Sequence, residues 1–139
     1  MFCRSLNIGS AAIRLATWSL WSHVALVRGA DVIEASARGG VRLTDVSELR
    51  ERYRESPIIG VAGLDGDSAW DYALSQLGKP YDFPGLLGLT PFRNWSDDSA
   101  WHCSELVGAC LIRGGVFSGN WKKQNRVTPQ DIWQRITYS

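Results

Sequence analysis

The chain has 139 residues, a formal net charge of +1, 45% hydrophobic residues and 21% charged residues. This length and composition predict one globular domain over residues 1–139 with an ordinary buried core. The near-neutral charge and the lack of a basic run argue against nucleic acid as a partner, because phosphate binding requires clustered lysines and arginines. No stretch of about 18 apolar residues is present, so the sequence predicts no transmembrane segment.

The cysteines and the N-terminal segment indicate the cellular compartment in which the protein is located. Cys3, Cys103 and Cys110 form no C-x-x-C pair, and an odd number of cysteines favours free thiols in a reducing compartment. Arg14 interrupts the apolar N-terminal stretch and no small-residue cleavage site follows, so we expect no export signal. The corresponding expectation is a cytoplasmic location in the producing cell.

The first half of the chain predicts a hairpin, a helix and a third strand. The β-rich runs 20–28 and 31–37 are separated by a Gly-Ala pair, which favours a tight antiparallel turn. Residues 44–54 carry apolar side chains at helical spacing, with Thr44 as the candidate cap. The apolar run 57–62, which Pro57 opens, is typical of a strand.

The second half predicts three helices and a long loop. Residues 67–77 have an apolar face, with Asp67 as the candidate cap and a glycine after the last turn. Residues 81–101 contain several Pro, Gly and aromatic residues, which indicates an ordered irregular loop. A helix over 103–113 ends at a glycine pair, and a last helix begins after Thr128, which is followed by proline.

Cys103 lies in the first turn of the predicted helix 103–113, where free backbone N–H groups and the helix dipole favour a thiolate. A cysteine nucleophile also needs a positioned imidazole. The chain contains His23 and His102. Consecutive residues at a helix start point in different directions, so His23 is the better candidate and His102 the weaker one.

The predicted hairpin sets Ala25 opposite Glu34 and His23 opposite Ser36, so that His23 and Glu34 are diagonal neighbours on one face. A carboxylate that accepts from a ring N–H fixes the tautomer and stabilises the imidazolium, as in a nucleophile triad. The residues therefore predict a set formed by Cys103, His23 and Glu34.

Structural roles are the common alternative for these residue types. A lone cysteine at a helix start and a lone strand histidine more often belong to the core, whereas the inward-facing acid Glu34 requires a partner. Cys110, on the apolar face of its helix, is predicted to be a core residue. No histidine or cysteine spacing matches a zinc site, so we predict no metal and no cofactor.

The sequence resembles the circularly permuted branch of the NlpC-type papain-like cysteine peptidases and amidases, the YiiX-like group. The resemblance covers about residues 20–133 and lies in the segments SHVALV, VIEA, GKPYDF, WHCSELVGACL and TPQDI. In the unpermuted enzymes a G-x-P-Y segment precedes a D-C-S-x-L-V helix and the histidine follows. Here the histidine strand comes first, which keeps the cyclic order.

The resemblance implies an α+β, papain-like fold in which the cysteine helix packs against a small antiparallel sheet. It implies Cys103 as the nucleophile, His23 as the general base, Glu34 as the orienting acid, and Tyr81 near the oxyanion or substrate. Its motifs contain the further candidate oxyanion or substrate-binding residues Ser22, Asp82, Trp101 and Ser104. Trp101 and His102 depart from the family pattern, in which an aspartate commonly precedes the cysteine.

The function that the resemblance implies is a thiol hydrolase of amide bonds, with peptidoglycan stem peptides as substrate and a bacterial or phage origin. Without an export signal, the protein would meet the cell wall through a holin, lysis or a delivery machine. Two alternatives stay open: a lipid acyl hydrolase or acyltransferase of the lecithin:retinol acyltransferase-like type, and a binding module without activity.

Overall fold

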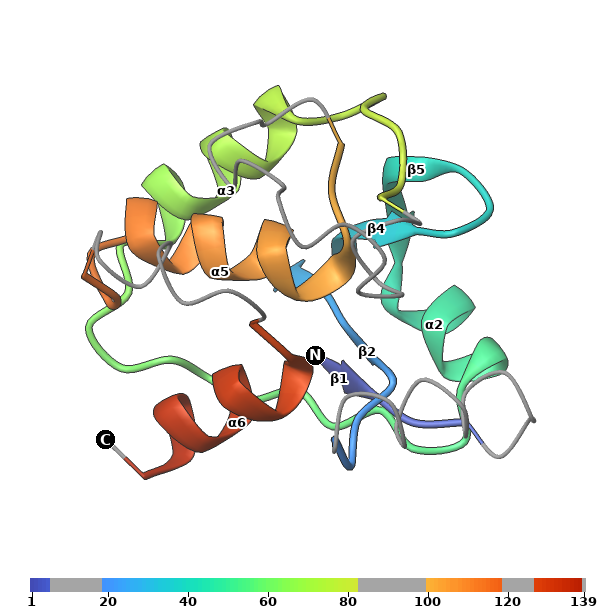
Figure 1. Ribbon diagram of the computed structural model, residues 1–139, viewed down its shortest axis with the longest axis horizontal. Coiled ribbons are helices and arrows are strands. Elements are labelled where there is room, and N and C mark those ends of the chain that lie inside the picture. The colour runs from blue at the N-terminus through green and yellow to red at the C-terminus, as the bar shows by residue number, and fades with distance from the viewer. Residues whose placement is uncertain (6–18, 83–99, 119–126, 139) are drawn as a thin grey trace, which may run out of the picture.

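The computed structural model describes residues 1–5, 19–82, 100–118 and 127–138. They form an α+β arrangement of two small antiparallel sheets and four helices (Figure 1). The elements are β1 (Phe2–Cys3), β2 (His23–Val24), β3 (Leu26–Arg28), β4 (Asp31–Ser36), β5 (Gly40–Asp45), α2 (Val46–Arg52), α3 (Gly66–Ser75), α5 (Cys103–Arg113) and α6 (Pro129–Thr137). Among these helices, none has the length and apolar character that a membrane span requires. Most of the predicted loop 81–101 lies outside the described residues.

The predicted hairpin is present as β3 and β4, which pair in the predicted register. Its first strand is shorter than predicted. At Ala25 the backbone N–H donates to the carbonyl of Met1 (2.9 Å), and the chain before it forms β2, which pairs with β1. His23 therefore lies opposite Cys3 in a separate sheet, and the predicted pairing of His23 with Ser36 is wrong.

Strand β5, which was not predicted, pairs with the other edge of β4 and sets Arg42 opposite Glu34. The sequence predicted Thr44 as the cap of the following helix. The strand instead continues to Asp45, whose carboxylate accepts from the backbone N–H of Glu48 (2.9 Å) and caps α2. Threonine and aspartate are both good caps, so only the pairing with β4 decides between them.

The third predicted strand, residues 57–62, is not part of either sheet. The backbone N–H of Phe2 donates to the carbonyl of Pro57 (3.0 Å), but a proline has no N–H to return the bond. The pairing therefore does not extend into this run. Ile59 and Val61 are partly buried and pack against the core that contains Phe2.

Helix α3 confirms the predicted helix 67–77, with a start one residue earlier and an end two residues earlier. Its cap is Asp65, whose carboxylate accepts from the N–H of Ser68 (3.1 Å), in place of Asp67. Leu74 and Leu77, predicted on the buried face, are each 40% exposed. Because the helix ends at Ser75, Leu77 lies beyond it and not on the helix face that packs against the core.

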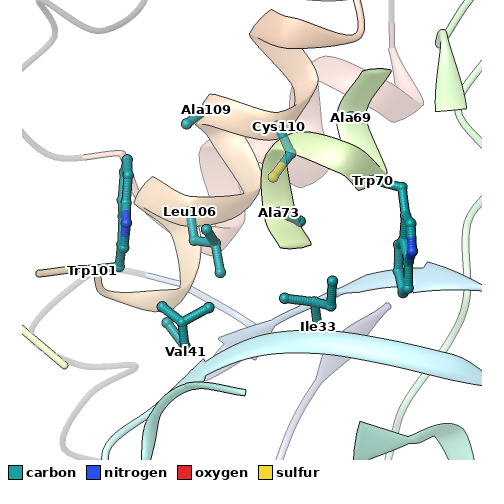
Figure 2. Close-up of a cluster of buried hydrophobic side chains, with 10 residues drawn as sticks. Ile33, Val41, Ala69, Trp70, Ala73, Trp101, Leu106, Ala109 and Cys110 are labelled. Atoms are coloured by element: carbon teal, nitrogen blue, oxygen red, sulfur yellow. The ribbon is translucent and has the colours of Figure 1, made fainter. Parts of the chain in front are cut away.

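Helices α5 and α6 begin where the sequence predicted them, and α5 is the centre of the fold. It packs against α3 on one side and α6 on the other, and it contacts β2 and β4 (Figure 1). Leu106 and Cys110 of α5 belong to a core cluster with Ile33 and Val41 of the three-stranded sheet and Ala73 of α3 (Figure 2). The prediction that Cys110 is a core residue is confirmed.

Gly40, at the start of β5, has a φ of +69° and lies against the segment that leads to Tyr81. A Cβ at this position would lie 2.2 Å from the carbonyl oxygen of Lys79. We expect Gly40→Ala to lower the free energy of unfolding by about 2–4 kcal/mol, because a left-handed backbone and a steric clash both carry a cost.

Gly29→Ala is the matched control, because Gly29 has a φ of +62° but nothing within 4 Å of its Cβ position. Its expected loss is only about 1–2 kcal/mol, from the backbone alone. Urea denaturation measures both losses. Equal losses would show that the contact with Lys79 has no steric cost.

Candidate active site

Cys103 is the first residue of α5, where backbone N–H groups without an intrahelical partner favour a negative charge. Burial alone raises the pKa of its thiol, but hydrogen bonds with the side chains of His102 and His23 outweigh burial and lower the pKa to about 6. The other two cysteines differ, because burial raises the pKa of Cys3 and of Cys110 to about 12. Near neutral pH, only Cys103 of the three is a thiolate.

The predicted contact between His23 and Glu34 is confirmed. Nε2 of His23 and Oε2 of Glu34 are 2.6 Å apart and buried. Because Nε2 binds the carboxylate, Nδ1 is the ring nitrogen left for the Cys103 sulfur. Burial lowers the pKa of His23, but the hydrogen bonds with Cys103 and Glu34 raise it to about 9. At neutral pH the sulfur and the ring therefore form a thiolate–imidazolium pair.

The His23 ring has a second fixed contact. The ring of Tyr53, directly after α2, is stacked on it, with centroids 5.5 Å apart and an angle of 8° between the planes. The stack and the bond to Glu34 together restrict both χ angles of His23. The imidazole is therefore held in one orientation toward α5.

Glu34 is fully buried, and both of its carboxylate oxygens are bound. Oε2 faces His23, and Oε1 accepts from Arg42 Nε (3.0 Å) and from Arg52. Burial raises the pKa of Glu34, but the hydrogen bond and the charge of His23, together with Arg52, lower it to about 2. The acid is therefore ionised and acts only as an acceptor toward the histidine.

Arg42, Arg52 and Tyr53 were not predicted as site residues. Arg42 lies on β5, and pairing that strand with β4 would have set it beside Glu34. Arg52 and Tyr53 lie at the end of α2, and no local pattern in the sequence shows that this end packs against the acid. The one available signal was Glu34 itself, because a buried carboxylate requires cationic partners.

Tyr81 lies beside Trp101, with which it forms a parallel bridge, and the N–H of Asp82 donates to the carbonyl of Trp101 (3.0 Å). Burial raises the pKa of the Tyr81 hydroxyl, and the negative charge of Cys103 raises it further. The structure thus brings Tyr81 into the electrostatic neighbourhood of the sulfur.

The remaining candidate substrate-binding residues make contacts within the protein. The hydroxyls of Ser22 and Ser104 donate to backbone carbonyls at 3.2 and 2.6 Å. The indole N–H of Trp101 donates to the side chain of Gln76 (3.1 Å), and Asp82 is buried. A substrate-binding role for these residues stays a prediction.

Among the residues that the structure describes, no three His, Cys, Asp or Glu side chains gather in a way that could hold a metal ion. No protein-family model and no curated protein sequence matches the chain. The geometry around Cys103 is therefore the basis for assigning a function.

Proposed function

We propose that the protein is a cysteine hydrolase that cleaves an amide bond through Cys103, His23 and Glu34. The observation that carries the proposal is the buried contact of 2.6 Å between His23 and Glu34. Strand β2, which carries His23, packs against α5, whose first residue is Cys103. We also propose that the α+β arrangement is the permuted papain-like fold of the NlpC type, as the sequence resemblance implies.

In the first half of the proposed reaction, the Cys103 thiolate attacks the amide carbonyl carbon. The backbone N–H of Cys103 and the hydroxyl of Tyr81 donate to the oxyanion of the tetrahedral intermediate. As the C–N bond breaks, the His23 imidazolium gives its proton to the leaving amine. The products of this half are a free amine and a thioester on Cys103.

In the second half, neutral His23 takes a proton from a water molecule, whose oxygen attacks the thioester carbonyl. The C–S bond breaks, the carboxylic acid leaves, and the thiolate–imidazolium pair is restored. Glu34 accepts from Nε2–H of His23 in both halves, so that Nδ1 carries the moving proton.

We propose peptidoglycan stem peptides as the substrate class. The support is the C-S-x-L-V segment that starts at Cys103, together with the histidine and acid strands that precede it. The lipid acyl hydrolase or acyltransferase and the binding module without activity are the alternatives, and each makes a different prediction in the experiment below.

The test begins with an acyl-donor probe and mass mapping of the labelled peptide. We expect one acyl group on Cys103 in the native protein and none in Cys103→Ala. That variant is its own control, because Cys3 and Cys110 are retained and the pKa of each thiol is near 12. Labelling at either of these cysteines would contradict the proposal.

The substrate is then identified by product mass, with purified peptidoglycan and mixed lipid vesicles in separate incubations. Release of peptide fragments from peptidoglycan supports the proposed function. Release or transfer of a fatty acyl group supports the lipid alternative. Absence of an acyl-enzyme and of any product in both incubations would leave the binding module.

A further inference from the structure

Four side chains around the His23 imidazole form a closed ring of contacts. The carboxylate of Glu34 binds Nε2 of His23 at 2.6 Å and also accepts from the guanidinium of Arg52. The same guanidinium lies over the ring of Tyr53, with its central carbon 5.5 Å from the centroid. Tyr53 in turn stacks on the imidazole, with the two ring centroids 5.5 Å apart. Arg52 therefore connects the acid to the stacked ring.

The end of α2 supplies both Arg52 and Tyr53. The helix ends at Arg52, and Tyr53 follows with an extended backbone, its N–H donating to the carbonyl of Leu49 (3.0 Å). Because the backbone changes from helical to extended between them, the two consecutive side chains reach different partners, the acid and the imidazole. Leu49 is fully buried, and Tyr53 packs against the same core cluster, which contains Val32. The end of α2 is therefore held against β4, the strand that carries Glu34.

Arg42 contacts the same acid but not the stacked ring. Its Nε donates to Oε1 of Glu34 (3.0 Å), and its guanidinium also pairs with Glu48 (2.6 Å). Within the residues that the structure describes, Arg42 lies over no aromatic ring. Both arginines thus give Glu34 a cationic partner, and of the two only Arg52 also contacts Tyr53.

The two contacts of the His23 imidazole fix different features of its geometry. The bond to Glu34 fixes the position of Nε2 but leaves the ring free to tilt about the line between Nε2 and Oε2. The stack with Tyr53 fixes the plane of the ring, since the angle between the two planes is 8°. In the proposed reaction Nδ1 must face the leaving amine and later the attacking water. A misplacement of about 1 Å can lower a rate by about 10², so the plane of the ring affects turnover.

We propose, on the basis of the proposed function, that Arg52 and Tyr53 are positioning residues for His23. Arg52 holds the acid and the stacked ring together as one unit, and this unit fixes the plane in which the imidazole gives and takes its proton. Both residues act through His23, and no proton moves through either of them.

The kinetic test compares variants on a peptide amide. Tyr53→Leu removes the stack, and Arg52→Met removes the guanidinium but keeps a long side chain. We expect each to lower kcat about 10- to 100-fold with KM within about twofold of the native value, because ground-state binding of the substrate is unchanged. Tyr53→Phe keeps the aromatic ring and should recover most of the lost kcat. The double variant should lose little more than the larger single loss, because either substitution alone opens the ring of contacts.

Two matched controls separate this role from other effects of removing an arginine. Arg42→Met removes a cationic partner of Glu34 and leaves the contact between Arg52 and Tyr53, so its loss of kcat should be smaller than that of Arg52→Met. Arg113→Met removes an arginine–tyrosine contact of 4.9 Å at the other end of α5, about 15 Å along the helix from its first residue. We expect native kinetics for Arg113→Met.

An NMR measurement tests the orientation of His23 without any substrate. The Nε2–H proton that bonds to Glu34 should give a downfield resonance, which is absent in His23→Ala. In Tyr53→Leu and Arg52→Met we expect this resonance to broaden through faster exchange with water, while circular dichroism shows an unchanged fold. If Arg52→Met does not fold, Arg52→Lys gives the readout, because it keeps a positive charge beside Glu34 but lacks the planar group that stacks on Tyr53.

The inference requires both a lower kcat and a broadened resonance, and the absence of either one in both Tyr53→Leu and Arg52→Met would overturn it and leave the proposed hydrolase intact. Equal losses in Arg42→Met and Arg52→Met, or a higher KM with kcat unchanged, would also overturn it, because the charge next to Glu34 or substrate binding would then explain the effect. A broadened resonance in variants of a protein that forms no acyl-enzyme on Cys103 would overturn the proposed function, and with it the role of both residues in proton transfer.

Discussion

His23→Ala is expected to lower kcat/KM for a peptide amide by about 10⁴- to 10⁶-fold, the range of losses found when a member of a nucleophile triad is removed. The amine leaving group must be protonated as the C–N bond breaks, and no other group in the proposed mechanism supplies that proton. The thiolate itself should persist in part, because Cys103 stays at the start of α5, where backbone N–H groups without an intrahelical partner stabilise a negative charge. The variant should therefore still react with alkylating reagents.

An activated ester of the same acyl group separates the loss of the proton donor from any loss of the thiolate, because a phenolate leaving group departs without protonation. We expect the loss of kcat/KM for the ester to be at least about tenfold smaller than the loss for the amide. Steady-state kinetics on both substrates, with the fold checked by circular dichroism, gives the comparison. Full amide turnover in His23→Ala, or equal losses on amide and ester, would remove His23 from the role of proton donor.

Local signals in the sequence predicted α5, which carries Cys103, the hairpin that carries Glu34, and α6. The glycine pair after Arg113 ends α5, the Thr-Pro pair starts α6, and the Gly-Ala pair sets the register of β3 and β4. Each signal lies within a few residues of the boundary that it determines. Such signals act through the backbone of their own segment, so they can be recognised without knowledge of the rest of the fold.

Long-range pairing could not be predicted in the same way. β1 has only two residues, Phe2 and Cys3, and its pairing with β2 closes a segment of about twenty residues. β5 contains the exposed Leu43 and the charged Arg42, so apolar and polar residues alternate only weakly along this strand. Both strands exist because a neighbouring strand offers free hydrogen-bonding groups. This is why the acid was predicted but its partner Arg42 on β5 was not.

The orientation of the His102 ring could not be predicted for a different reason. Helix geometry gives the directions of side chains within a helix, but the N-cap residue has extended backbone angles and does not follow that pattern. Its direction depends on what its ring contacts, here Glu105 and Ser104. A histidine at an N-cap followed three residues later by a glutamate is the signal that the sequence offered.

Glu34→Gln is expected to have the second large effect, on both stability and activity. The substitution removes the negative charge of a fully buried group and leaves His23, Arg42 and Arg52 without their shared anion. Loss of one partner of a buried ion pair costs about 3–5 kcal/mol. The side chains of Arg42 and Arg52 are 35% and 29% exposed, so water compensates in part and we expect about 2–3 kcal/mol.

The same variant is expected to lower turnover by about 10²- to 10⁴-fold, because an amide can present its N–H to Nε2 and stabilise the wrong tautomer of His23. The pKa of His23 should fall, since one of the contacts that raise it is the Glu34 carboxylate. Titration of the His23 ring resonances by NMR measures this fall. A turnover within about twofold of the native protein would exclude Glu34 as the orienting acid.

The pH dependence of the stability loss gives the sharper test. The pKa of Glu34 is about 2 in the folded protein and 4.5 in its ordinary state, so its carboxylate stabilises the fold above about pH 4.5, and this contribution is lost as the pH falls toward 2. The difference in unfolding free energy between the native protein and Glu34→Gln should therefore be full at about pH 7 and smaller at about pH 3.

Asp67→Asn is the matched control, because it breaks an ion pair of 2.7 Å with Arg28 at an 80% exposed side chain. It should change stability little at either pH, and a difference for Glu34→Gln that stays constant with pH would show that the carboxylate is not held as an anion by its three partners.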